Sequence, residues 1–219
     1  MFEAGRRVDG GRLPATGDPA LLPKHADVAA VSVAPATLER IRSRFPRLRA
    51  IGEEIPLPLA VHYDPPEACG RDRVMAVMGA LHRLPDAPAV LVLESGTCLT
   101  ATLGLREGGV VGGAILPGYA LMLASLADGT AALPRLTADV PVEGGMGRST
   151  AASMRQGCWA AQIGAARELT ALCRAECAHD LKVVAAGTGA GILARDLAEI
   201  DAVHPFATLW GVYLSALQA

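Results

Sequence analysis

The chain has 219 residues, of which 51% are hydrophobic and 19% charged, and its formal net charge is −2. The length fits one large domain or two small ones, and the apolar share excludes a disordered chain. Twenty Lys and Arg against 22 Asp and Glu exclude a strongly basic nucleic-acid binder on bulk charge, although a local basic patch stays open. The two lysines, Lys24 and Lys182, both lie outside any Walker-type glycine loop, which excludes a P-loop NTPase.

The chain carries no sign of secretion or of a membrane span. Residues 1–7 contain no apolar run of the signal-peptide type, and no stretch approaches the roughly 18 apolar residues of a span. The five cysteines are odd in number and form no Cys-x-x-Cys pair. The sequence therefore predicts a cytoplasmic protein with free thiols. A metal site at Cys173, Cys177 and His179 is less favoured than burial of the two thiols on one helix, because zinc sites usually bring a second spaced pair.

The first 86 residues predict two strands and two helices. Residues 27–33 form a short apolar run typical of a buried strand, and Thr37 is the expected N-cap of a helix that ends near Phe45. Residues 57–63 predict a second short extended segment. Apolar residues recur with helical spacing between Gly70 and Arg83, which predicts an amphipathic helix there.

The second half predicts a strand meander followed by alternating helices and strands. Three strands joined by tight turns are expected over residues 90–93, 99–105 and 110–116. A helix starts at Gly118, and Ser149 or Thr150 caps a long helix to about Cys177. A buried strand at 182–186, a glycine-rich turn at 187–191 and a last helix at 205–217 complete an α/β pattern with mixed strand directions.

The chain also carries an ordered series of short motifs. They are Tyr63-x-x-Pro66, Gly70-Arg71-Asp72-Arg73, Glu94-Ser95-Gly96-Thr97, the Gly-Gly-Ala-Ile-Leu-Pro-Gly of residues 112–118, Thr130–Pro134, Gly147–Thr150 and Gly157. This succession resembles the type III pantothenate kinases of the acetate/sugar kinase–Hsp70–actin superfamily. The resemblance implies a duplicated RNase H-like (actin-like ATPase) α/β fold with mixed sheets flanked by helices. Residues 1–86 would form an incomplete first half with the substrate turn at 70–73, and residues 87–219 the second half.

The resemblance also implies roles for individual residues. Asp72 takes the place of the general base that accepts the proton of the pantothenate hydroxyl, a step suited to a carboxylate. Arg73 is placed to meet a phosphate or carboxylate. The expected substrate-binding residues are Tyr63, Gly70, Arg71, Asp72, Arg73 and Thr150, with Thr150 reaching the substrate from the neighbouring subunit. Gly96 and Thr97 would contact ATP, and Glu94 would bind a monovalent cation.

The implied cofactors are ATP with Mg²⁺ and a monovalent cation, K⁺ or NH₄⁺. The implied assembly is a homodimer, with the helix of residues 150–177 as a candidate interface. Structural interpretations stay open beside these roles. Asp72 can serve as a carboxylate at a helix N-terminus, Thr150 as a cap and Tyr63 as ordinary edge packing. The glycines of residues 112–118 are expected to shape the backbone, and the five histidines are expected to be structural or on the surface.

Several positions depart from the family pattern. The family opens with an Asp-x-Gly-Asn-Thr turn that binds the ATP phosphates, and the chain contains no such sequence. Residues 2–7 instead resemble the strand that follows this turn, so we expect the chain to start after the first strand. Glu94 is one methylene longer than the family's aspartate, which crowds a cation site. Residues 186–189 stand where the family has Thr-Gly-Gly, which alters the adenine side.

Two accounts follow from these departures. In one, Met1 is a misassigned start of a complete kinase that phosphorylates pantothenate in the first step of coenzyme A synthesis. In the other, the chain is an inactive homologue that acts as a regulator, as described for Bvg accessory factors. The arginines between Arg40 and Arg49 would support nucleic-acid contact, although a solvated helix face is favoured. We predict little or no kinase activity for this polypeptide, because the first phosphate loop is absent.

Overall fold

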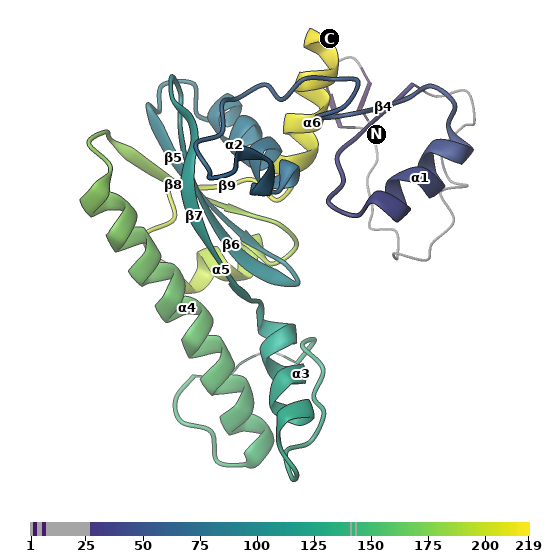
Figure 1. The fold of residues 1–219 in the computed structure, drawn as a ribbon. Helices are drawn as coiled ribbons and strands as arrows, with labels where there is room; N and C mark the ends of the chain where they lie inside the picture. The colour runs from purple at the N-terminus through teal and green to yellow at the C-terminus, as the bar shows by residue number, and fades with distance from the viewer. Residues whose placement is uncertain (1, 4–5, 8–26, 141, 143) are drawn as a thin grey trace.

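A five-stranded mixed sheet, ordered β7-β6-β5-β8-β9, occupies the centre of the computed structural model (Figure 1). The structure describes residues 2–3, 6–7, 27–140, 142 and 144–219, so Lys24 and His25 lie outside the described residues. The strands are β5 (Ala89–Ser95), β6 (Cys98–Leu105), β7 (Gly109–Pro117), β8 (Leu181–Ala186) and β9 (Ala202–Val203). Strand β6 is antiparallel to both β5 and β7, whereas β8 runs parallel to β5 and β9 parallel to β8. The predicted meander is confirmed.

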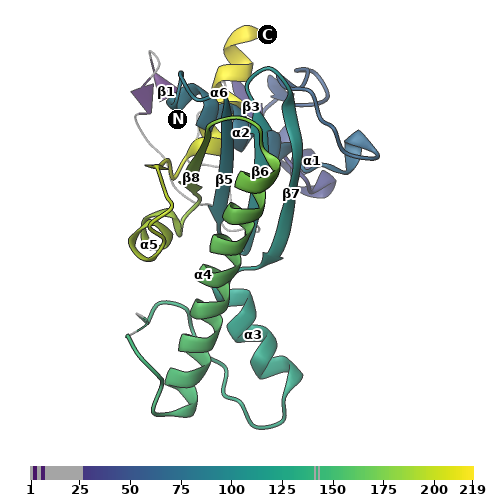
Figure 2. The ribbon, with the colours of Figure 1, turned by 90° about the vertical axis from the view of Figure 1, so that its left-hand side faces the viewer.

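Helices cover both faces of this sheet (Figure 2). Helices α2 (Arg71–Arg83) and α6 (Ala207–Gln218) pack on one face, and α4 (Thr150–Glu176) and α5 (Ala190–Asp196) pack on the other. Strand β5 is buried on both faces because its side chains alternate between the two cores, with Val90 and Val92 in one and Leu91 and Leu93 in the other. Across the sheet from β7 to β9, its strands come third, second, first, fourth and fifth in the chain. The predicted mixed α/β, RNase H-like arrangement is confirmed.

The N-terminal part is smaller and carries two short strand pairs. Strand β1 (Phe2–Glu3) pairs antiparallel with β2 (Arg6–Arg7), so residues 2–7 hold two short strands where we expected one. Strand β3 (Val28–Ala30) pairs parallel with β4 (Leu48–Ala50), and α1 (Pro35–Arg44) connects them. A short 3₁₀ helix, η2 (Pro66–Ala68), leads into α2.

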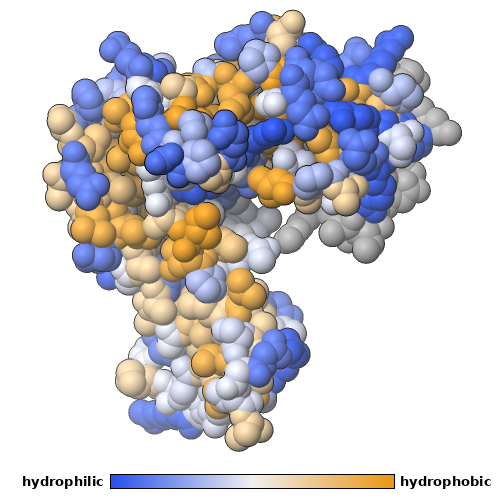
Figure 3. All heavy atoms as spheres, in the orientation of Figure 1, coloured by the Kyte–Doolittle hydropathy of each residue, from blue (hydrophilic) through white to orange (hydrophobic). Residues whose placement is uncertain are grey.

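Helix α3 (Tyr119–Gly129), the described residues between 130 and 149 and the first half of α4 project away from the sheet as an arm (Figures 1 and 3). The two helices share a small apolar cluster of their own, made by Leu123, Met154 and Cys158. Apolar side chains also lie on the outside of the arm, where Leu121 is 40% and Met146 is 91% exposed. The packing of the two helices of the arm against each other therefore leaves part of the arm's apolar surface exposed.

The prediction that Thr37 caps the first helix is wrong. The N-cap is Ala34, and Pro35 occupies the first helical turn, where its fixed φ and missing N–H cost nothing. The Ser32 hydroxyl accepts a hydrogen bond from the Ala34 N–H at 3.0 Å, which fixes the chain just before the helix. Thr37 lies inside the first turn.

The extended segment expected at residues 57–63 is also absent as a strand. A single bridge joins Val61 to Val110, and the other residues of the segment are irregular. Pro56 and Pro58 explain this, because each removes a backbone donor that a strand ladder requires. The expected helix at 70–83 and the long helix from Ser149 are confirmed, with Ser149 as the N-cap.

The division into halves at residue 86 stays a prediction. Helix α2 comes before this boundary and α6 after it, yet the two pack against each other over the same apolar core. No helix among the described residues is long and apolar enough to cross a membrane.

Candidate functional site

The first turn of α2 holds the expected catalytic carboxylate in a fixed position. Gly70 is the N-cap of the helix, and the Arg73 N–H donates a hydrogen bond to Asp72 Oδ1 at 3.0 Å. A Cβ on Gly70 would lie 2.5 Å from Asp72 Oδ1. Glycine at this position therefore lets the carboxylate fold back over the helix start, where the helix dipole also favours a negative charge.

Arg73 is buried and its guanidinium is held by strand β6. Its Nε donates to Thr102 Oγ1 at 2.9 Å and its Nη2 donates to the Ala101 carbonyl at 3.0 Å. The Tyr63 ring lies against the same group, with the guanidinium carbon 5.6 Å from the ring centroid. Both hydrogen-bonding partners are uncharged, so these bonds leave the positive charge in place to attract an anion.

Glu94 lies close enough to Asp72 and Arg73 for their charges to act on it. Burial raises the pKa of the Glu94 carboxyl, the negative charge of Asp72 raises it further, and Arg73 opposes both. A hydrogen bond donated by the Thr208 hydroxyl of α6 to Glu94 Oε1, at 2.8 Å, also stabilises the ionised form. The end of β5 and the start of α2 thus bring two carboxylates and one guanidinium into a single neighbourhood.

Two buried hydroxyls accompany these charges. Tyr63 Oη and Thr100 Oγ1 are both covered and have no hydrogen-bond partner among the described residues. Thr100 is directly opposite Glu94 in the β5–β6 register, so their side chains share the face that α2 covers. We call this group the polar cluster: Tyr63, Asp72, Arg73, Glu94, Thr100 and Thr102.

Sequence reasoning missed the threonines of the polar cluster and Thr208. A signal was present, since Thr100 and Thr102 alternate with apolar residues along β6 and so had to face the same side. Nothing in the local pattern indicated that this side would meet Arg73 or that Thr208 would reach Glu94. Chemically, the cluster offers carboxylates that accept a proton from a ligand hydroxyl and a cation that attracts an anionic group.

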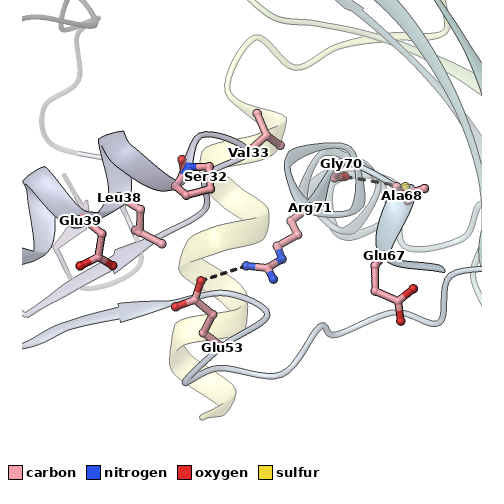
Figure 4. Close-up of a pocket in the computed structure, with 11 residues that line it drawn as sticks. Ser32, Val33, Leu38, Glu39, Glu53, Glu67, Ala68, Gly70 and Arg71 are labelled. Carbon is pink, nitrogen blue, oxygen red and sulfur yellow. Dashed lines mark hydrogen bonds and ion pairs between the residues drawn. The ribbon is translucent and has the colours of Figure 1, made fainter. Parts of the chain in front are cut away.

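A cavity of about 380 Å³ lies at the start of α2 (Figure 4). Gly70 and Arg71 line one wall, and the Arg71 guanidinium contacts Glu53 at 3.3 Å. The opposite wall comes from Val33, in the segment between β3 and α1, and from Leu38 of α1 itself. The volume falls in the range of small-molecule sites, and the walls combine apolar surface with charged groups.

The hairpin turn after β5 lies next to the glycine-rich turn after β8. Gly96 and Thr97 are exposed at the tip of the hairpin. The Gly189 N–H donates to the Ser95 carbonyl at 3.0 Å, and the Gly118 N–H donates to the Thr97 carbonyl at 2.9 Å. Backbone and hydroxyl groups of the two turns thus gather at one edge of the sheet, and the ATP contact of Gly96 and Thr97 stays a prediction.

Thr150 does not join the other candidate residues. It is the first residue of α4 and exposed, at the end of the arm that is farthest from α2 (Figure 1). Its neighbour Ser149 is the cap, accepting a hydrogen bond from the Ala152 N–H at 3.2 Å. Within one chain, the expected substrate contact of Thr150 is not formed.

The fit of a metal ion can be tested on the side chains present. Among the described residues, no group of three or more His, Cys, Asp or Glu is placed to hold a metal ion. One oxygen of Glu94 already accepts the hydrogen bond that Thr208 donates, so this carboxylate alone supplies too few ligands for a cation. A cation at Glu94 therefore requires further oxygen ligands from a bound nucleotide, from backbone carbonyls or from water.

The sheet order β7-β6-β5-β8-β9, with helices on both faces, is the mixed α/β arrangement of an RNase H-like fold. A sequence profile described as type III pantothenate kinase matches residues 16–172. The chain therefore belongs to the type III pantothenate kinase family.

One of two similar solved structures shows the same fold. A protein from Campylobacter jejuni, described as a Baf family transcriptional activator, superposes with a TM-score of 0.60 at 13% identity, over 88% of this chain and 82% of that one. Component A of (R)-2-hydroxyglutaryl-CoA dehydratase from Acidaminococcus fermentans gives a TM-score of 0.40 at 13% identity, over 86% of each chain. The first likeness supports the fold, and the second is too low to carry an argument.

Proposed function

We propose that this chain binds pantothenate and ATP and transfers the γ-phosphoryl group to the primary hydroxyl of pantothenate, the first step of coenzyme A synthesis. The observation that carries the proposal is that Asp72 and Arg73, at the start of α2, lie over the same face of the sheet as Glu94 near the end of β5. The family membership supports the choice of substrate. The free thiols of all five cysteines suit action in the cytoplasm.

The proposed chemistry needs few groups. Asp72 accepts the proton of the pantothenate hydroxyl while the oxygen of that hydroxyl attacks the γ-phosphorus of ATP. ADP leaves with the electrons of the broken P–O bond. Mg²⁺, when bound with ATP, supplies charge neutralisation at the phosphates. Thr97 donates hydrogen bonds to those phosphates, and Gly96, whose own N–H donates to the Cys98 carbonyl at 2.9 Å, lets them approach the backbone closely. A monovalent cation would lie at Glu94.

The cavity at the start of α2 suits the rest of the pantothenate molecule. Arg71 lines it and offers a cation to the substrate carboxylate, which then competes with Glu53 for the guanidinium. Apolar contacts from Val33 and Leu38 suit the methyl groups of the pantoyl part. Thr150 of a second copy would complete the site, which makes the active form a homodimer.

The test measures binding and turnover separately. Calorimetry should detect pantothenate binding that Asp72→Ala weakens at least tenfold, consistent with losing a charge-assisted hydrogen bond. Pantothenate-dependent ADP formation, with Mg²⁺ and K⁺ or NH₄⁺, should be slow, because the chain contains no Asp-x-Gly-Asn-Thr turn. Absence of pantothenate binding contradicts the kinase proposal, whereas rapid ADP formation contradicts the expected low activity.

A regulator that binds DNA is the second candidate. Its support is the description of the C. jejuni neighbour as a transcriptional activator. The basic stretch of residues 40–49 gives the regulator little support, because Arg42 pairs with three carboxylates, those of Glu39, Glu53 and Glu54. The regulator predicts salt-sensitive DNA binding that weakens when the arginines of residues 40–49 are neutralised. Absence of any mobility shift with DNA removes this candidate.

A further inference from the structure

Gln162 is a polar side chain at a position where the helix pattern calls for an apolar one. It lies near the middle of α4 and is 1% exposed. The residues one helical turn away on the same stripe are Cys158 and Ala166, and both are buried with it. A buried amide in such a stripe is costly unless its donors and acceptor are used. The hydrogen bonds of the Gln162 amide therefore indicate what this side chain does in the fold.

Those contacts lead to the end of strand β5. Gln162 Nε2 donates to Ser95 Oγ at 3.4 Å, a long hydrogen bond compared with the usual distance of about 2.9 Å. Gln162 Oε1 is buried and has no partner among the described residues. The side chain of Ser95 is buried too, on the face of the sheet that α4 covers.

Ser95 joins the two turns at this edge of the sheet. Its carbonyl accepts the Gly189 N–H at 3.0 Å. A Cβ on Gly187, which has φ +80°, would lie 2.5 Å from that carbonyl oxygen, and a Cβ on Gly189 would lie 2.4 Å from Ser95 Oγ. The turn after β8 therefore rests directly on Ser95, and the hairpin tip at Gly96 follows it immediately.

The same face of α4 makes a second polar contact one turn earlier. Trp159 Nε1 donates to Asp196 Oδ2 at 2.7 Å, at the end of α5. Helix α5 begins just after the glycine-rich turn, and Trp159 bonds its last residue, so this contact reaches the helix that follows the turn and not the turn itself. Helix α4 thus contacts the end of β5 through Gln162 and helix α5 through Trp159.

We propose that Gln162 is a positioning residue that, through Ser95, fixes the hairpin turn at residues 95–97 against the glycine-rich turn at 187–189. The further consequence, that this alignment sets the affinity for a nucleoside triphosphate, rests on the proposed function. Because α4 starts at Thr150, the same helix would also connect the nucleotide edge of one subunit to the substrate contact offered to another. Gln162 acts only through Ser95 and does not touch the reacting atoms.

The test of positioning uses hydrogen exchange in the whole, ligand-free chain. Gln162→Met keeps the size and the unbranched shape of the side chain and removes the amide. We expect exchange in the segments 95–97 and 187–190 to become about three- to tenfold faster, as for the loss of one hydrogen bond. Gln162→Asn retracts the amide and should produce the same change, which keeps the test open if the methionine variant does not fold.

The matched control is Thr170→Val on the same helix. Thr170 is also 1% exposed, but its hydroxyl donates to the Ala166 carbonyl within the helix and reaches neither turn. This variant should leave exchange in both turns unchanged. Wild-type exchange in both turns of folded Gln162 variants overturns the inference.

Nucleotide binding supplies the second measurement. In Gln162→Met, the dissociation constant of a non-hydrolysable ATP analogue should rise about three- to tenfold, while the dissociation constant of pantothenate stays at the wild-type value. In Thr170→Val, the dissociation constants of both ligands should stay at their wild-type values. A wild-type chain that binds no nucleotide contradicts the proposed function, and the exchange measurement still decides the positioning role. Faster exchange in the turns with an unchanged ATP constant overturns the consequence for nucleotide affinity alone.

Discussion

Arg73 is the residue around which the polar cluster is arranged. Its guanidinium lies between the Tyr63 ring and strand β6, and the space for it is created by Gly113 on strand β7. A Cβ at Gly113 would lie 2.2 Å from Arg73 Nη2 and 2.1 Å from the Ala101 carbonyl oxygen. The second glycine of the Gly112–Gly113 pair is therefore required by a contact between layers, and not by the shape of a turn.

Gly113→Ala should therefore displace Arg73 and destabilise the chain. The expected loss is about 1–3 kcal/mol in the free energy of unfolding, the usual cost of overpacking a tight site. Pantothenate binding should weaken in the same variant, because the cation moves. Denaturant unfolding and calorimetry measure the two effects.

The neighbouring Gly112 provides the control, because a Cβ there meets no atom within 4 Å. Gly112→Ala should unfold at nearly the wild-type denaturant concentration and bind pantothenate normally. Equal stability of the two alanine variants would show that Gly113 is not the constraint that its contacts indicate.

At the scale of elements, the packing of α2 against α6 joins the substrate turn to the end of the chain. His204 lies just before α6, is 9% exposed, and donates its backbone N–H to the Ala185 carbonyl of β8. Burial lowers the pKa of His204, and the charges of Arg83 and His82 on α2 lower it further. Its ring lies 6.4 Å from that of Trp210, which stacks on His82 at 6.0 Å.

The depressed pKa of His204 makes the stability of the chain depend on pH. The folded state binds a proton on His204 less readily than the unfolded state, whose pKa is near the ordinary 6.5. The stability is therefore fully present above about pH 6.5 and is lost as the pH falls through the folded pKa below it. His204→Gln should flatten the fall in the free energy of unfolding between about pH 7 and pH 5.

The measurement is denaturant unfolding at a series of pH values, with the exposed His179→Gln as the control. That variant should reproduce the wild-type slope. A His204→Gln variant with the wild-type slope would assign the pH dependence to other groups.

At the scale of the whole molecule, the arm places Thr150 far from Asp72 of its own chain (Figure 1). If Thr150 contributes to the substrate site, it does so from a second copy. A contact with a second copy would bury exposed apolar side chains of the arm, Leu121 and Met146. A homodimer would then cover this surface and complete two sites at once.

A mixing experiment tests this arrangement. Asp72→Ala and Thr150→Val chains should each bind pantothenate weakly as pure proteins. In an equimolar mixture, half of the dimers are mixed and each holds one intact site, so about a quarter of all sites should recover full affinity. Calorimetric stoichiometry measures the recovered fraction. A mixture no better than its components would mean that Thr150 does not act across subunits.

The sequence by itself determined the order of the main helices and strands, but it predicted neither β4 nor β9. The β5–β6–β7 meander, the amphipathic α2 and the Ser149 cap follow from neighbouring residues, because period, turn chemistry and capping act over a few positions. Local signals failed where two of them competed, as at Thr37 beside Pro35 and in the proline-rich segment before Tyr63. The motif order placed Asp72 and Arg73 at a helix start, and the structure agrees.

Only the tertiary structure decided which side chains meet. Arg73 finds Thr102 and Ala101, Glu94 finds Thr208, and Gln162 finds Ser95, over separations of 28 to 114 residues. These contacts depend on strand register and on how helices lie across the sheet, which no local pattern encodes. The physical reason is that secondary structure follows from short-range preferences, whereas a site depends on the packing of distant segments into one core.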